Sequence, residues 1–197
     1  MKTPSKTILS VLLLLPLWGC QTIPARLTAV SPFDKSRYLG KWYEIARYDL
    51  VFERNLNQTT AEYSLNEDGS VRVVNRGYDT VKKNWRQASG TARFVGADTV
   101  GMLKVSFFGP FYAGYNVLAL DDEYRYALVC GSNRDYLWIL SRTPSLPPDI
   151  RSLYLNKARG MGFDTEKLLW IDHAQPLKKS SDTLIDRSST RGMTGLS

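Results

Sequence analysis

The stretch Tyr38-Leu39-Gly40-Lys41-Trp42-Tyr43-Glu44-Ile45-Ala46-Arg47 decides how the rest of the chain is interpreted. A glycine ahead of a strand lets the backbone turn tightly, and a tryptophan at the start of that strand can plug one end of a core. A Gly-x-Trp sequence is equally compatible with an ordinary buried tryptophan in any β protein. The stretch therefore indicates a closed barrel end only if the following segments form a barrel.

Downstream of Trp42 the chain consists of short β-prone segments separated by turn signals. The connection at 66–69 is typical of a hairpin, because its glycine tolerates a positive φ. The expected strands are residues 42–51, 59–65, 70–78, 85–95, 102–108, 115–120, 124–130 and 135–141. These segments predict an all-β fold, an eight-stranded up-and-down antiparallel β-barrel that encloses one small ligand. A two-sheet sandwich is the alternative, but its crossovers usually need longer connections.

The hydrophobic period changes after the last of these strands. Apolar residues at 150, 153, 154, 158 and 161 form one stripe, which predicts a C-terminal α-helix. Residues 168–171 are expected to form a short final strand. Residues 176–197 are rich in Ser, Thr and Lys and poor in large apolar side chains, so a disordered basic tail is expected there.

Charge and cysteine usage narrow the possible functions. The formal net charge is +7, but the basic residues are not gathered in a dense stripe, so nucleic-acid binding is not expected. The chain has only two cysteines. Cys130 lies in an apolar run, where a free cysteine usually serves as a small buried side chain.

Residues 1–19 have the features of a signal peptide, with Lys2 and Lys6 ahead of an apolar run at 8–17. That run is too short for a bilayer span, which needs roughly 20 apolar residues. Its end, Leu17-Trp18-Gly19-Cys20, resembles the lipobox of bacterial lipoproteins. An ordinary secretory signal followed by an incidental cysteine is the alternative.

The lipobox resemblance implies that Cys20 becomes the mature N-terminus and carries several acyl chains, which anchor durably to a membrane. Gln21 rather than aspartate follows the cysteine, which in this class implies sorting to the outer membrane of a diderm bacterium. Residues 20–32 would then form a lipidated tether ahead of a barrel domain at 33–175.

Three separated motifs have the order and spacing of a known family: Gly40-Lys41-Trp42-Tyr43, Asn133-Arg134-Asp135-Tyr136 and Leu140-Ser141-Arg142-Thr143-Pro144. With the eight strands and the single late helix, the chain resembles a lipocalin, most of all the lipoprotein lipocalins of the bacterial outer membrane. The resemblance implies that Arg142 lies across the Trp42 ring in a cation–π contact that closes the barrel floor. The role of this pair would then be structural.

Ligand binding is expected at the opposite end. Trp138 has the parity of Arg142 and lies about 13 Å from it at roughly 3.3 Å per residue, in the body or mouth of the barrel. The window 107–115 is the most aromatic of the chain and is expected to form an apolar portal at this end. Exposed aromatics that merely cap a turn, or the contact surface of a homodimer, are the alternatives.

The expected ligand-binding residues are Tyr112, Trp138, Phe107, Tyr115 and Glu44. Tyr112 and Trp138 would present a hydroxyl and an indole N–H to a polar head group. Glu44 shares the parity of Trp42, so its carboxyl would face the interior. The possible partners for a ligand phosphate or carboxylate are Arg47, Arg72, Arg76 and Arg93, with none preferred.

The resemblance implies a non-enzymatic protein without a cofactor. It would store or transport fatty acids or lysophospholipids for envelope maintenance under stress. A lipocalin-fold enzyme is the second hypothesis. The single histidine, His173, is expected on the final strand outside the barrel, so neither a metal site nor a Ser-His-Asp triad can be assembled inside it. No catalytic or metal-binding residue is therefore expected. A binder of haem, a pigment or an antimicrobial compound is the third.

Overall fold

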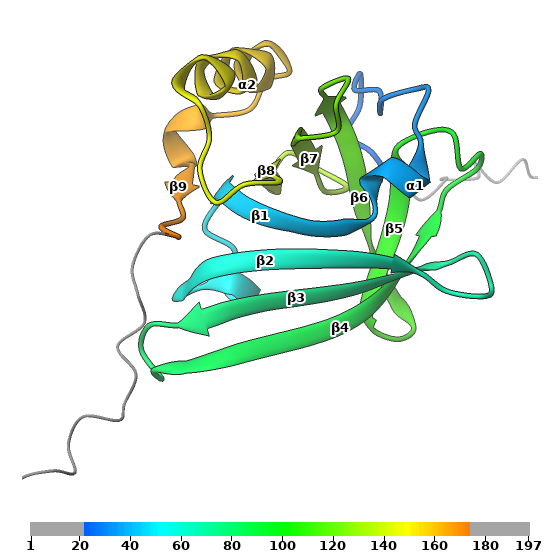
Figure 1. Ribbon diagram of the computed structural model, residues 1–197. Helices are drawn as coiled ribbons and strands as arrows, with labels where there is room; N and C mark the ends of the chain where they lie inside the picture. The colour runs from blue at the N-terminus through cyan, green and yellow to red at the C-terminus, as the bar shows by residue number, and fades with distance from the viewer. Residues whose placement is uncertain (1–21, 174–197) are drawn as a thin grey trace, which may run out of the picture.

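The computed structural model describes residues 22–173 (Figure 1). The expected signal peptide, Cys20 and the basic tail lie outside these residues, so their assignments stay predictions. Within the described part, no helix has the length and apolar character required to cross a membrane.

Eight strands close into an antiparallel barrel. They are β1 (Gly40–Arg47), β2 (Leu56–Leu65), β3 (Val71–Asp79), β4 (Asn84–Phe94), β5 (Met102–Phe108), β6 (Phe111–Leu120), β7 (Tyr126–Cys130) and β8 (Leu137–Ser141). Each strand pairs with the next along the chain, and β1 pairs with both β2 and β8. The predicted up-and-down barrel is confirmed. Because its connections alternate between the two ends, the β1–β2, β3–β4, β5–β6 and β7–β8 connections share the end opposite the start of β1.

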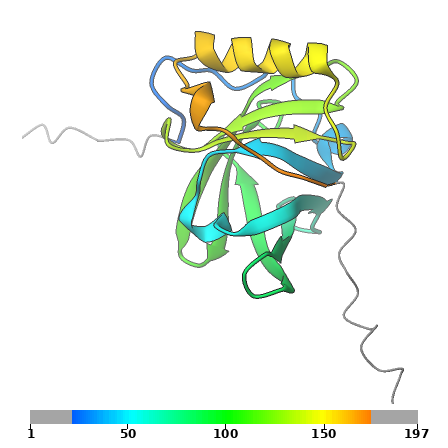
Figure 2. The ribbon, with the colours of Figure 1, turned by 90° about the vertical axis from the view of Figure 1, so that its left-hand side faces the viewer.

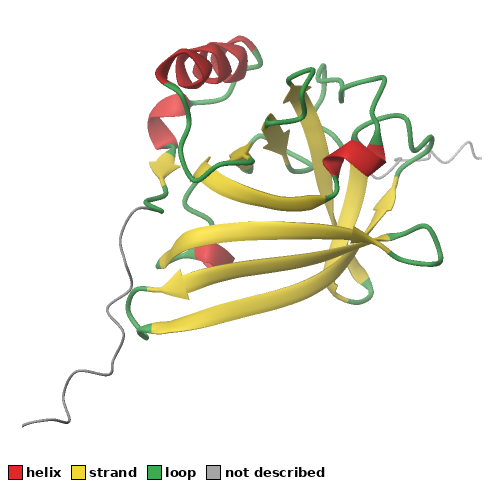
Figure 3. Cartoon of the chain, in the orientation of Figure 1, coloured by secondary structure: helices red, strands yellow, loops and turns green. Residues whose placement is uncertain are grey.

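The remaining elements lie outside the barrel. They are α1 (Lys35–Tyr38), the 3₁₀ turns η1 (Val51–Glu53) and η2 (Thr165–Lys167), α2 (Pro148–Gly160) and β9 (Leu169–Trp170). The predicted helix and final strand are confirmed, and α2 lies across the outside of the barrel (Figure 2). The short elements α1, η1 and η2, drawn in red together with α2 in Figure 3, are too short to leave a periodic sequence pattern.

Two apolar clusters stabilise this arrangement. One fills the closed end and the lower interior of the barrel and includes Trp42, Val73 and Leu140. The other lies between the barrel wall and α2 and includes Ile139 and Tyr154. Adjacent residues of β8 thus serve different cores, as the alternation of side chains along a strand requires.

A β-bulge between Glu44 and Ala46 changes the alternation in β1. Ile45 and Ala46 both belong to the cluster beneath α2. Arg47 then turns back toward the interior, opposite Trp138 of β8. The bulge therefore adds a second charged side chain to the interior beside Glu44.

The aromatic window at 107–115 differs from its expected form. β5 extends to Phe108 and β6 begins at Phe111, so a two-residue turn joins two strands that were expected to be separated by a longer portal. The sequence predicts too late a start for β6, because glycines at 109 and 114 and a proline at 110 are typical of a loop.

The segment that precedes the barrel follows its outer wall. Val30 N donates to Val117 O at 2.8 Å, and Phe33 N donates to Thr99 O at 2.8 Å. Further back, the Asn116 Nδ2 amide donates to Thr22 O at 2.7 Å. The described part of the expected tether is thus bound to the barrel rather than free of it.

Candidate ligand-binding site

The closed end is built on Trp42, which is 0% exposed. The Arg142 guanidinium carbon lies 3.9 Å from the centre of the Trp42 ring. The same guanidinium donates to the backbone oxygens of Lys41 at 2.8 Å and Arg37 at 2.7 Å. The contact implied by the lipocalin resemblance is therefore present, and hydrogen bonds from the cation to the backbone of α1 and β1 fix its position.

Three tyrosines form the layer above this floor. Tyr115 shares hydrogen bonds between hydroxyls with Tyr38 at 2.7 Å and with Tyr63 at 2.8 Å. Burial raises the pKa of all three hydroxyls, so they stay neutral. Tyr115 thus lies deep in the barrel, in the tyrosine layer above the floor.

A buried cluster of charged groups occupies the wall made by β1, η1 and β8. The Arg47 Nε atom lies 2.8 Å from Glu44 Oε1 and 3.3 Å from Glu53 Oε2. Arg47 Nη2 also donates to the backbone oxygens of Glu53 at 2.7 Å and Leu56 at 3.0 Å. Trp138 Nε1 donates to Glu53 Oε2 at 3.2 Å. Trp138 and Glu44 therefore belong to one polar cluster that also contains Arg47 and Glu53.

Burial shifts both carboxyls of this cluster toward their protonated forms. Burial raises the pKa of Glu44 well above its ordinary value, and the nearby Glu53 adds to the rise while Arg47 opposes it. Burial also raises the pKa of Glu53, again opposed by Arg47. One cation faces two carboxyls, so the cluster reaches neutrality when one carboxyl holds a proton. Glu44 Oε1 and Arg47 Nε form no well-aligned hydrogen bond, so their contact is mainly electrostatic.

Replacing Glu44 with Gln is expected to flatten the pH dependence of stability. Because its pKa is higher in the folded than in the unfolded protein, the proton on Glu44 stabilises the fold. This contribution is complete below the ordinary value of 4.5 and is lost as the pH rises through the folded pKa. Urea unfolding of the parent should show a decline of up to about 1.4 kcal/mol per pH unit in this window. An unchanged slope in Glu44→Gln would contradict this assignment.

The wall opposite this cluster carries several small apolar residues, with the polar Asn75 between Ala61 and Ala88. The register directs Ala61, Ala88, Gly90 and Ala113 toward the interior, on the faces that carry Val73 and Tyr115. Ala88 and Ala113 are nevertheless exposed, so the upper interior is accessible to solvent. A Cβ on Gly90 would lie 2.8 Å from the Phe107 ring, so the glycine allows Phe107 to cover the wall.

The barrel wall is incomplete beside this surface. The β4–β5 ladder ends at the Thr91–Ser106 pair, so residues 84–90 of β4 pair only with β3. Figure 1 shows β4 and β5 diverging from that point. The edge of β4 that faces β5 is therefore without a strand partner along residues 84–90.

Tyr112 lies elsewhere. It is 48% exposed on the outer face of β6, where the Lys104 ammonium lies 5.0 Å from its ring centre. Its neighbour Ala113 takes the inward position. The structure therefore brings Phe107, Trp138 and Glu44 to the interior and Tyr115 to its lower layer, but it does not bring Tyr112 to Trp138.

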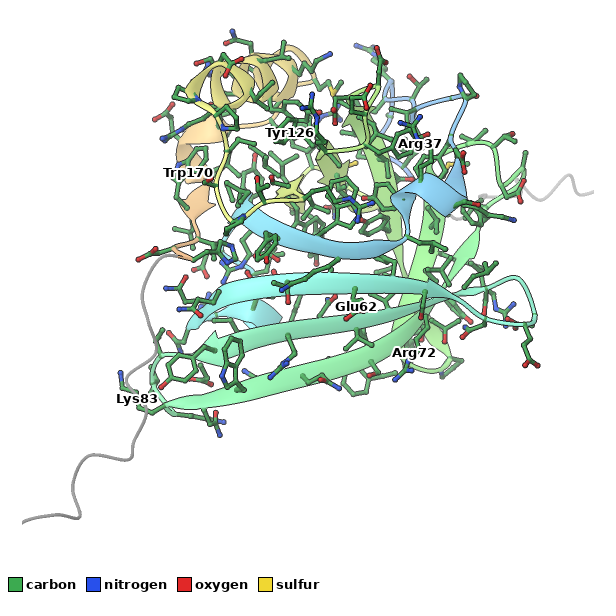
Figure 4. All side chains as sticks on the ribbon, in the orientation of Figure 1. Arg37, Glu62, Arg72, Lys83, Tyr126 and Trp170 are labelled. Carbon is green, nitrogen blue, oxygen red and sulfur yellow. The ribbon has the colours of Figure 1, made fainter. Side chains whose placement is uncertain are left out.

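The arginines considered as partners for an anionic head group also lie on different faces of the barrel wall. Arg47 faces inward and is fully engaged by the cluster. Arg72, Arg76 and Arg93 alternate with inward residues and point outward; Figure 4 shows Arg72 on this outer surface. Arg86, opposite Gly77 on the interior face, lies 3.7 Å from Asp79 near the mouth. Its parity with Ala88 and Ala92 was the sequence signal that would have found it.

Cys130 and His173 both lie away from the barrel interior. Cys130 is buried, and burial raises the pKa of its thiol to about 12. The His173 Nε2 atom lies 2.9 Å from Glu44 O on the outside of β1. In residues 22–173 no group of three or more His, Cys, Asp or Glu side chains is placed to hold a metal ion.

Comparison with known proteins identifies the family to which the chain belongs. Residues 33–173 match the lipocalin-like domain family, and the chain belongs to that family. It is 55% identical to the outer membrane lipoprotein Blc of Escherichia coli K12 over 150 residues, which cover 76% of this chain and 85% of that protein. Blc of Vibrio cholerae is 47% identical over 167 residues, 84% of this chain and 98% of that protein. Among solved structures, insecticyanin from the tobacco hornworm Manduca sexta shares the fold, with a TM-score of 0.63 at 23% identity. The match covers 78% of this chain and 88% of insecticyanin.

Proposed function

We propose that this protein binds an amphiphilic lipid, a fatty acid or a lysophospholipid, with its acyl chain inside the barrel. The observation that carries the proposal is the contrast between the two opposite walls of the barrel interior. A wall of small apolar side chains with Phe107 across it faces the cluster of Trp138, Glu53 and Arg47. An apolar chamber with a few oriented polar groups suits a ligand with a long apolar part and one polar end.

The positions of the charges favour one orientation of the ligand. Arg47 is held by two carboxyls and two backbone oxygens, so it is not available to an entering anion. Near the mouth, Arg86 is half exposed and Lys82 and Lys83 are exposed in the β3–β4 turn. The phosphate or carboxylate would remain beside these cations while the acyl chain lies below Trp138.

The same proposal covers location and role. The relatives at 47–55% identity are named outer membrane lipoproteins, which supports acylation of Cys20 and anchoring at an outer membrane. A binding protein held at that surface can store lipid or transfer it during envelope stress. No enzymatic step is part of the proposal, since the titratable groups of the buried cluster form ion pairs with one another.

Organic extraction of the purified protein followed by mass spectrometry tests the ligand class. Fatty acids or lysophospholipids in near-stoichiometric amounts are expected. A barrel that yields no lipid and then binds none of a panel of these lipids would rule the proposal out. Recovery of a different apolar compound would instead favour another small-molecule ligand.

Replacing Trp138 with Ala is expected to weaken fatty-acid binding about tenfold, equivalent to roughly 1.4 kcal/mol, because an interior aromatic surface is lost. Trp138→Phe keeps most of that surface and removes only the N–H that Glu53 accepts, so a smaller effect is expected. The matched control is Trp85→Ala, since Trp85 lies outside the barrel beneath Arg76. Titration with a fluorescent fatty acid measures all three, and equal affinities would remove Trp138 from the site.

A further inference from the structure

The β5–β6 hairpin presents an apolar tip to solvent. Phe108 is 81% exposed and Phe111 is 78% exposed, and the two residues are cross-strand partners. Neither ring contributes to either core cluster. Two adjacent phenylalanines left uncovered at a loop tip typically mark an interaction surface.

Behind this tip, the outer face of the hairpin carries more polar side chains. Tyr112 follows Phe111 and is half exposed. The Lys104 ammonium lies over the Tyr112 ring, 5.0 Å from its centre. Apolar rings at the tip, then a tyrosine, then a lysine is the order that suits a membrane interface, where tyrosine occupies the head-group level and lysine reaches the charged surface.

The hairpin is also close to the point where the described chain begins. Thr22 O accepts a hydrogen bond from Asn116 Nδ2 on β6. A Cβ on Gly114 would lie only 2.4 Å from Thr22 O, so the chain is in direct contact with β6 here. Gly114 is about 10 Å from Phe111 along the strand. Cys20 precedes Thr22 by two residues, so an acyl anchor there would hold this hairpin near the lipid surface.

We infer that the tip of the β5–β6 hairpin, Phe108 and Phe111 with Tyr112 and Lys104 behind it, docks on a bilayer that contains anionic lipid. The docking surface is separate from the ligand site, and its position beside the membrane depends on the proposed acylation of Cys20. The hairpin is a second, reversible contact that orients the open end of the barrel toward the membrane.

Other residues at the open end favour a bilayer over a second copy of the chain. The η1 turn exposes Val51 and Phe52, and the β3–β4 turn exposes Val81 beside Lys82 and Lys83. Apolar tips on separate connections suit an extended lipid surface. A symmetric pairing of open ends would bring these lysines toward those of the other copy, whereas anionic lipid would attract them.

Vesicle flotation of a chain that begins at Gln21 tests the inference without the acyl anchor, and this chain retains every contact described here. The test variant is the double substitution Phe108→Ser and Phe111→Ser. The matched control is Leu65→Ser with Leu153→Ser, which removes two half-exposed leucines from the end of β2 and from α2. With vesicles of phosphatidylcholine and phosphatidylglycerol, the test variant is expected to partition about tenfold or more weakly than the parent, and the control to match the parent.

Two further measurements sharpen the result. Lys104→Gln should weaken partition only when phosphatidylglycerol is present, and the difference should disappear at high salt. A tryptophan placed by Phe111→Trp should be quenched by brominated lipid, whereas one placed by Leu65→Trp should not. Parent-like flotation of the test variant would overturn the inference. So would a variant that changes the oligomeric mass in solution but not the partition, since the surface would then join two copies. Lipid extraction of the same parent protein reports separately on the proposed function.

Discussion

Replacing Trp42 with Ala is expected to lower the free energy of unfolding by about 3–5 kcal/mol, the usual range for a buried aromatic side chain. Trp42 is fully buried, its Nε1 donates to Tyr38 O at 2.8 Å, and its ring carries the Arg142 guanidinium at 3.9 Å. The substitution removes the plug and the surface on which the cation rests. Against a typical domain stability of 5–15 kcal/mol this is a large loss, and urea unfolding followed by circular dichroism measures it.

Arg142→Lys tests the contribution of the guanidinium separately from that of the Trp42 ring. Lysine keeps the charge but loses the planar fork that reaches Lys41 O, Arg37 O and Tyr124 O. We expect a smaller loss than for Trp42→Ala, and an intact lipid site in the fraction that folds. If Trp42→Ala were as stable as the parent, the closed end would not depend on this contact.

Replacing Arg47 with Met is expected to destabilise the fold by about 3–5 kcal/mol at neutral pH, because it leaves two buried carboxyls without their cation. The side-chain volume is roughly retained, so packing is not the main cause. Glu44 and Glu53 already have raised pKa values, and removal of Arg47 raises both further. The cost should therefore grow as the pH rises above the ordinary carboxyl range and shrink in acid, where both groups are neutral. Urea unfolding over a range of pH values measures this.

The control is the same substitution in a chain that also carries Glu44→Gln and Glu53→Gln. With no buried charge left, Arg47→Met should cost little there, since a neutral replacement of a buried ion cluster is often nearly neutral in stability. A double-mutant comparison gives the coupling directly. Equal losses in both backgrounds would show that Arg47 stabilises the fold through packing or its backbone hydrogen bonds.

The fold was accessible from the sequence because turn residues and hydrophobic alternation mark its hairpins. Trp42 and Arg142 followed from the family motifs. Trp138 was placed inside by simple parity with Arg142, and the register agrees. The placement of Trp138 depends on local spacing along an uninterrupted strand, where the alternation of side chains is reliable.

The rest of the site depends on interruptions that spacing does not show. Parity from Trp42 through Glu44 directs Ala46 inward and Arg47 outward, and the bulge reverses this. Tyr112 was expected in a portal because β6 was assigned too late a start, so no face was available for it. Glu53 reaches Trp138 from a single 3₁₀ turn, whose existence depends on tertiary contacts rather than on a repeating pattern.

The pairing of β9 with β1 bears on how the protein folds. Beyond Tyr43, where its pairing with β2 ends, β1 is bordered by Leu169 and Trp170, and Ile171 N donates to Ile45 O at 2.9 Å. The first strand thus depends on residues more than 120 positions later in the chain for its last partner. Such distant contacts raise the contact order, which slows folding. During synthesis one edge of β1 stays unsatisfied until almost the whole barrel sequence has emerged, so a chain cut before Leu169 should be far more prone to aggregate than its small loss of mass suggests.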